Sequence, residues 1–200
     1  MTGQRMKMPQ YETRELSPET WPDFEKLAPQ QGQCWCMYYH RAKPVTSRMT
    51  REEATARNRR DKKALVRNGK SHAVLVYDGE KLAGWCQYGP KEELPRIDAG
   101  RNYKKLEPLP PEQRLWRITC FYVDKKYRKK GVARTALRYA IDSIKQQGGG
   151  IVEAYPVVST KMATVPEWLW FGTPRMFLRE KFKQVAPLGT SLALMRRTVE

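Results

Sequence analysis

The most informative chemistry in the sequence lies in a short basic turn between an apolar run and an amphipathic segment. Arg128-Lys129-Lys130-Gly131-Val132-Ala133 follows the strand-like run Leu115 to Val123 and opens the helical pattern. The first amides of a helix lack intrahelical partners, and the helix dipole places partial positive charge at that end. Gly131 lets a bound group approach the backbone closely because glycine has no Cβ. The turn therefore predicts an anion site suited to a pyrophosphate.

A solvated helix start is the alternative interpretation, since runs of charge are usually exposed. The glycine spacing does not fit the P-loop, which requires Gly-x-x-x-x-Gly-Lys-Ser/Thr, or the three-glycine dinucleotide fingerprint. The sequence therefore fits neither an NTPase nor a Rossmann oxidoreductase.

The turn resembles the acetyl-CoA signature of the GNAT superfamily of N-acyltransferases, which reads Gln/Arg-x-x-Gly-x-Gly/Ala after the fourth strand. Arg128, Gly131 and Ala133 match its three defined positions. The elements from Ser17 onward also follow the family's order, so the resemblance covers most of the chain and implies a single domain over residues 1–200. The segments 118–121 and 153–156 look like a bacterial branch whose acceptors are mostly unassigned.

The resemblance implies that acetyl-CoA is the co-substrate and that it binds where the fourth and fifth strands separate. The amides from Arg128 to Arg134 would hold the pyrophosphate, and an amide near Tyr122 or Val123 would polarise the thioester carbonyl. The cofactor-binding residues implied in this way are Phe121, Tyr122, Val123, Arg128, Lys129, Lys130, Gly131, Val132, Ala133, Arg134 and Phe177.

The sequence departs from the family at the catalytic acid and base. Many relatives carry a tyrosine donor where this chain has Phe177, and some carry a glutamate base where Arg117 stands. Direct attack by a neutral amine needs a group that takes its proton. Glu153 and Tyr155, at the end of the fifth strand, are predicted as catalytic substitutes. The alternatives are a structural ion pair for Glu153 and a pocket wall for Tyr155.

The cysteines and histidines are the remaining candidates for chemistry. Cys34-x-Cys36 followed by two isolated cysteines lacks zinc-like spacing, so no metal site is predicted. Cys120 is interpreted as a small hydrophobe in a strand, with a substrate-facing thiol as the alternative. His40 and His72 have no neighbouring nucleophile or carboxylate in the sequence and are predicted to lie on the surface or in loops.

Hydrophobic periodicity and turn signals predict the elements that must position these residues. Helices are expected at 17–28 with Ser17 as N-cap, at 50–67 with a capping box from Thr50 to Glu53, at 131–147 and at 174–181. Strands are expected at Cys34 to Tyr39 and at 73–77, 82–88, 115–123, 151–155, 182–185 and 191–197. Long insertions are expected at about 89–114 and 156–173. The order predicts an α/β (α+β) fold: a mixed, mostly antiparallel central sheet of about six to seven strands, flanked by helices.

Composition limits the partners and the location. The net charge of +17 over 200 residues exceeds what CoA requires. The basic segment Arg57 to Arg67 is interpreted as an exposed face, with an RNA, ribosome or acidic-protein acceptor as the alternative. No RNA-binding motif is evident, so specific nucleic-acid binding is not predicted. The sequence shows no membrane-length apolar run, no secretory signal in Met1 to Gln10 and only four cysteines, which predicts a cytoplasmic protein.

The favoured function is transfer of an acetyl group from acetyl-CoA to an amine, a small molecule, by direct attack. The alternative is a non-catalytic acyl-CoA-binding or nucleic-acid-associated module on the same fold, because the usual acid and base are missing. A homodimer is left open.

Overall fold

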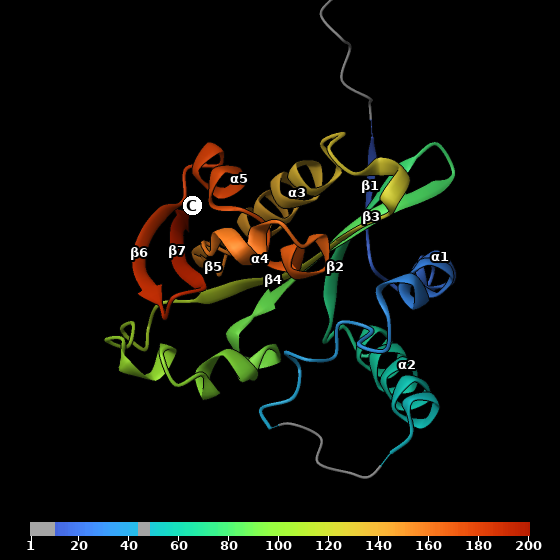
Figure 1. The fold of residues 1–200 in the computed structure, drawn as a ribbon, viewed down its shortest axis with the longest axis horizontal. Helices are drawn as coiled ribbons and strands as arrows, with labels where there is room; N and C mark the ends of the chain where they lie inside the picture. Colours follow the sequence, from blue (N-terminus) through green and yellow to red (C-terminus); the bar gives the residue numbers. More distant parts are fainter. Residues whose placement is uncertain (1–10, 44–48) are drawn as a thin grey trace, which may run out of the picture.

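The computed structural model describes residues 11–43 and 49–200. The prediction that there is no secretory signal concerns Met1 to Gln10, which lie outside the described residues. Seven strands form one sheet in the order β1-β2-β3-β4-β5-β7-β6, with helices packed against it (Figure 1). The strands are β1 (Glu12–Glu15), β2 (His72–Asp78), β3 (Lys81–Pro90), β4 (Leu115–Val123), β5 (Gly150–Ala154), β6 (Lys183–Leu188) and β7 (Leu192–Val199). Neighbouring strands are antiparallel, except that β4 and β5 are parallel. The predicted fold class is confirmed.

Two apolar clusters cover the two faces of the sheet. The α-helices are α1 (Trp21–Leu27), α2 (Arg51–Arg67), α3 (Val132–Gln146), α4 (Thr160–Ala163) and α5 (Pro174–Arg179). Successive residues of a strand point to opposite faces. Val74 and Val76 of β2 accordingly pack with α3, whereas Leu75 and Tyr77 pack with α1 and α2.

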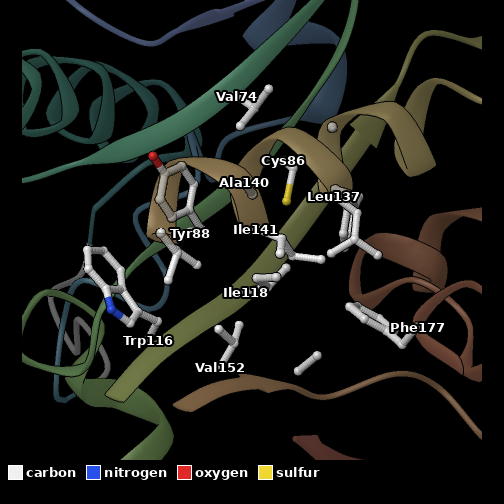
Figure 2. Packing of buried hydrophobic residues seen from close by; sticks show 14 of the residues in the cluster. Val74, Cys86, Tyr88, Trp116, Ile118, Leu137, Ala140, Ile141, Val152 and Phe177 are labelled. Atoms are coloured by element: carbon white, nitrogen blue, oxygen red, sulfur yellow. The ribbon is translucent and has the colours of Figure 1, made fainter. Parts of the chain in front are cut away.

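Helix α3 is held on the sheet by one continuous apolar face. Its buried residues recur at helical spacing and are Val132, Ala136, Leu137, Ala140, Ile141 and Ile144. Figure 2 shows Leu137, Ala140 and Ile141 facing Ile118 of β4 and Val152 of β5. Because this face is fixed against the central strands, the helix start is fixed relative to the end of β4.

The predicted strand from Cys34 to Tyr39 is wrong. The segment folds into turns, in which Trp35 and Cys36 have left-handed φ angles of 51° and 54°. Trp35, Cys36 and Met37 are buried against α1 and the sheet, so the apolar content of the segment comes from packing in the core and not from a strand. The strand that the prediction missed is β1, whose four residues are too short and too polar to give an alternating signal.

The helix starts were predicted with mixed success. The capping box is present, because the Thr50 side chain accepts from the Glu53 amide and the Glu53 side chain accepts from the Thr50 amide. The prediction that Ser17 is the N-cap of the first helix is wrong, because α1 begins at Trp21 and its N-cap is Thr20. The Ser17 side chain accepts from the Thr20 amide in the turn that precedes α1. Helix α2 buries Lys62 and Val66, so it is not polar on every side.

The two long insertions, one between β3 and β4 and the other between β5 and α5, contain short helical turns. The first contains the 3-10 turns η2 (Lys91–Glu93), η3 (Pro95–Ala99) and η4 (Tyr103–Lys105), and the second contains α4 and η6 (Pro166–Phe171). None of the helices in the described part of the chain has the length and apolar character needed to cross a membrane.

Replacing Leu137 tests the packing of α3. Leu137 is fully buried between the helix and the sheet, so Leu137→Ala should lower the free energy of unfolding by about 2–5 kcal/mol through lost burial and a new cavity. The exposed Lys145 on the same helix is the matched control, and Lys145→Ala should change stability by less than about 0.5 kcal/mol. Urea unfolding of both variants measures the difference, and equal stabilities would contradict the packing described here.

Candidate functional site

The parallel pairing of β4 and β5 stops before β4 ends. The register runs from Leu115 opposite Ile151 to Ile118 opposite Ala154, where β5 ends. Beyond that point β4 continues to Val123 with β3 as its remaining neighbour in the sheet, and the register with β3 shifts next to Thr119. The predicted separation of the two strands is therefore present. It leaves one edge of residues 119–123 without a strand partner in the sheet.

The unpaired edge is followed along the chain by the 3-10 turn η5 (Lys125–Tyr127) and then by the basic turn. Lys129 and Gly131 have left-handed φ angles of 62° and 92°, and Gly131 is the N-cap of α3. Gly131 has no side chain to cap the helix, so the first amides of α3 are offered to a ligand. Val132 is buried in the core, while the side chains of Lys129 and Lys130 are exposed beside those amides. The turn has the geometry and the charge of an anion site.

Arginines of the turn and of the first turn of α3 make polar contacts within the protein. Arg134 Nε lies 2.8 Å from Glu180 Oε1, and Arg128 Nε lies 3.5 Å from the Val123 carbonyl. These contacts fix the two side chains near the start of α3.

Phe121 and Phe177 pack against each other in the apolar core between β4 and α3. Their ring centroids are 6.0 Å apart in an edge-to-face arrangement, and Phe177 is fully buried in the cluster shown in Figure 2. A phenylalanine ring has no hydroxyl, so this position cannot supply the proton that a tyrosine there would give.

Glu153 is a completely buried carboxylate with partners on both oxygens. Its Oε1 accepts from Arg196, at 2.9 Å from Nε and 2.8 Å from a terminal guanidinium nitrogen. Its Oε2 accepts from the hydroxyls of Tyr155 at 2.8 Å and Tyr103 at 2.7 Å. Burial and the nearby carboxylate raise the pKa of Tyr103 to about 12 and that of Tyr155 well above its usual range. Both hydroxyls therefore keep their protons at neutral pH, and Glu153 has the ion pair foreseen as its structural alternative.

Arg117 anchors the first insertion to β4. Its guanidinium is fully buried, lies 2.6 and 2.9 Å from the two Asp98 carboxylate oxygens, and donates to the Leu94 carbonyl at 2.8 Å. Burial by itself disfavours the charge, but the hydrogen bonds to Asp98 raise the pKa of Arg117 above its usual value. The position taken by a glutamate base in some relatives is thus used here to hold η3 in place.

A cavity of about 540 Å³ lies beside these residues, and Tyr155 and Tyr103 form part of its wall. Residues from the turn before α2, from the first insertion, from η6 and from β6 and β7 complete it: Tyr38, Tyr39, Ala42, Arg96, Ile97, Ala99, Gly100, Arg101, Asn102, Phe171, Leu188 and Leu192. The predicted alternative for Tyr155, a pocket wall, is therefore realised. Its hydroxyl and that of Tyr103 connect the cavity to the buried Glu153. A second cavity, of about 590 Å³, is lined by Leu115 and Trp116 at the start of β4 and also by Asp98, Tyr103 and Arg196, so Tyr103 borders both cavities.

The two histidines have partners that their sequence neighbours did not reveal. His72 is the half-buried first residue of β2 and its Nε2 lies 3.5 Å from the Glu93 carboxylate, so the predicted surface or loop position is wrong. His40 is half-buried and contacts Ser71 Oγ and Lys62 Nζ through Nε2. Burial and the Lys62 charge lower the pKa of His40 to about 2, so its ring is neutral. In the described residues, no group of three or more His, Cys, Asp or Glu could hold a metal ion.

Sequence comparison identifies the family to which this fold and site belong. Residues 11–164 match the model of the acetyltransferase (GNAT) family, which is most of the chain. The chain belongs to the GNAT acetyltransferase family. No curated protein sequence matches it significantly.

Solved structures show the same fold at low sequence identity. A Desulfovibrio desulfuricans protein described as a GNAT-family acetyltransferase has a TM-score of 0.56 and 16% identity, with 95% of this chain and 99% of that chain covered. An N-acetyltransferase from Staphylococcus aureus Mu50 has a TM-score of 0.52 and 14% identity, covering 96% and 99%. Arabidopsis thaliana NAA60 in complex with acetyl-CoA has a TM-score of 0.52 and 15% identity, covering 95% and 99%.

The ion pair beneath the cavity gives a prediction for stability. Arg196→Met leaves the buried Glu153 carboxylate without its cation and should lower the free energy of unfolding by about 3–5 kcal/mol. Combining it with Glu153→Gln removes the unpaired charge, so the double variant should be more stable than Arg196→Met alone. Denaturant unfolding of the two single variants and the double variant measures the energetic coupling between Arg196 and Glu153. Strictly additive losses of stability would contradict the predicted coupling.

Proposed function

We propose that this protein transfers the acetyl group of acetyl-CoA to an amine. The observation that carries the proposal is the order of the parts along the chain, because the unpaired edge of β4 is followed, after η5, by the glycine-capped start of α3. The amides and side chains from Arg128 to Arg134 would bind the pyrophosphate, as in the family signature. The membership of the chain in an acetyltransferase family supports the same activity.

The open backbone edge of Phe121, Tyr122 and Val123 is proposed to pair with the pantetheine arm. An extended amide-containing chain beside a free strand edge can form the hydrogen bonds that a neighbouring strand would otherwise make. The rings of Phe121 and Phe177 would lie on one side of the arm. A backbone amide near Tyr122 or Val123 would donate to the thioester oxygen as negative charge develops there.

The acceptor amine is proposed to enter the cavity bounded by Tyr155 and Tyr103. Its nitrogen attacks the thioester carbon, the carbon–sulfur bond breaks, and CoA leaves as a thiolate that takes up a proton. The proton lost by the amine passes to the Tyr155 oxygen while the Tyr155 hydroxyl proton passes to Glu153 Oε2, 2.8 Å away. Glu153, which is buried, thus acts through Tyr155, which lines the cavity.

The non-catalytic alternative is not favoured. A module that only binds acyl-CoA needs no acceptor cavity connected to a buried carboxylate. For nucleic acid, the basic face of α2 is partly neutralised, because Arg57 lies 3.6 Å from Asp61 and Arg59 lies 2.6 Å from Glu25. A small-molecule amine acceptor, a cytoplasmic location and the absence of a metal remain predictions.

Gly131 gives the most direct test of cofactor binding. Gly131→Asp adds a side chain and a negative charge at the anion site, so calorimetry should detect no binding of acetyl-CoA. Gly79, in the hairpin between β2 and β3, also has a left-handed φ angle, of 59°, with open space around it. Gly79→Asp therefore imposes a similar backbone cost away from the site and should bind acetyl-CoA normally. Near wild-type affinity in Gly131→Asp would rule out this cofactor site.

The proton path is tested by removing one hydroxyl or one charge. Tyr155→Phe and Glu153→Gln should each lower kcat by roughly 10²–10⁴-fold at neutral pH while the affinity for acetyl-CoA is unchanged. The loss should shrink at high pH, where the amine is already neutral. Tyr103→Phe is the matched control, because Tyr103 donates to the same Glu153 oxygen without a role in the path, and its loss should be smaller. Full kcat in Tyr155→Phe at neutral pH would show that the tyrosine and glutamate are structural.

A further inference from the structure

Two cysteines outside the proposed acetyl-transfer machinery lie in direct sulfur contact. Cys36 belongs to the turns between α1 and α2, and Cys120 belongs to β4, 84 positions further along the chain. Their sulfur atoms are 3.4 Å apart, and both side chains are buried. Nothing in the proposed transfer reaction uses this contact.

The surroundings of the pair favour a thiolate at Cys36. The Trp85 indole N–H donates to Cys36 Sγ at 3.2 Å, whereas the Gln31 side-chain N–H donates to Cys120 Sγ at 3.1 Å and the Gln31 side-chain oxygen lies 3.4 Å from Cys36 Sγ. The contact with Cys120 and the nearby charge of Lys62 outweigh burial and lower the pKa of Cys36 to about 6. The same contact raises the pKa of Cys120 well above its usual value, so Cys120 remains the thiol partner.

Lys62 is the unusual feature of this region. It is fully buried, and its Nζ donates to Gln87 Oε1 at 2.7 Å. None of the ion pairs found among the described residues involves it. Burial lowers the pKa of Lys62, because an ammonium is costly to bury. Negative charge on nearby groups, Cys36 first among them, opposes that shift.

We propose that Cys36 and Cys120 are an oxidisable dithiol that closes to an intramolecular disulfide. With a peroxide as oxidant, the Cys36 thiolate attacks one oxygen, the O–O bond breaks, and a sulfenic acid and hydroxide form. The Cys120 sulfur then attacks the Cys36 sulfur, its thiol proton leaves, and the hydroxyl departs as water. The hydroxide takes up the proton that the Cys36 thiol released, so the two cysteines lose two electrons in total and the peroxide is reduced to two waters. The sulfurs have to close from 3.4 Å to about 2.05 Å, the length of a disulfide bond.

The bridge would join the wall of the cavity to the strand beside the open edge. Tyr38 and Tyr39 follow Cys36 closely in the chain and line the cavity, and Cys120 precedes Phe121 on β4. A covalent link here would restrict how far the wall can move from β4. Its consequence for acceptor binding rests on the proposed function, whereas formation of the bridge does not.

Peptide mapping by mass spectrometry tests the bridge without any activity assay. The full-length reduced protein is treated with hydrogen peroxide, the free thiols are alkylated, and the digest is analysed with and without a reductant. A Cys36–Cys120 linked peptide should appear and vanish on reduction. The oxidised protein should also melt about 5 °C or more above the reduced one, because the link constrains the unfolded chain.

Matched variants separate this pair from the other thiols. Cys36→Ser and Cys120→Ala should each abolish both the linked peptide and the rise in Tm, and either variant suffices if the other does not fold. Cys86→Ser should change neither, because Cys86 is buried with its hydrogen bond to the neighbouring Gln87 carbonyl. A bridge through Cys34, stable sulfinic acid at Cys36, or a folded protein in which both thiols remain reduced would overturn the proposal.

Discussion

The early end of the parallel pairing between β4 and β5 is the constraint on which the site depends. A fully paired strand would have no free backbone groups, but β4 runs on past Ala154 of β5 with one edge open. Helix α3 is packed by its apolar face against the same strands, so its amide-rich start is fixed at the end of that edge. The open edge and the anion site are therefore consequences of how one strand ends and how one helix packs.

Buried charges give the cavity its shape. Arg117 holds the first insertion through Asp98, and Arg196 holds Glu153 below the cavity wall. Removing charges from water is expensive, and such pairs give little net stability compared with an apolar replacement. Their value here is positional, because they place Tyr103 and Tyr155 with both hydroxyls on one carboxylate oxygen. The hydrogen-bonded network can therefore move a proton. Replacing one member alone would leave another buried polar group without its partner.

The sequence predicts the parts of the molecule that local patterns determine. The apolar run of β4 and the helical periodicity of α3 place both elements to within about one residue, and the glycine turn between them marks the candidate site. The turns at Cys34 to Tyr39 were mistaken for a strand because apolar content was visible while the left-handed φ angles of Trp35 and Cys36 were not. Tyr103 was missed altogether. It reaches Glu153 across 50 positions of sequence, through an insertion whose position is determined by tertiary contacts.

The central claim is that acetyl-CoA occupies the opening between β4 and β5 and the start of α3. Hydrogen–deuterium exchange with and without acetyl-CoA measures this directly, because a bound ligand that accepts backbone hydrogen bonds protects those amides. The amides of residues 121–123 and 131–134 should exchange more slowly when acetyl-CoA is added, with little change in the hairpin between β2 and β3. Unchanged exchange in both segments at saturating acetyl-CoA, with protection elsewhere, would contradict the account.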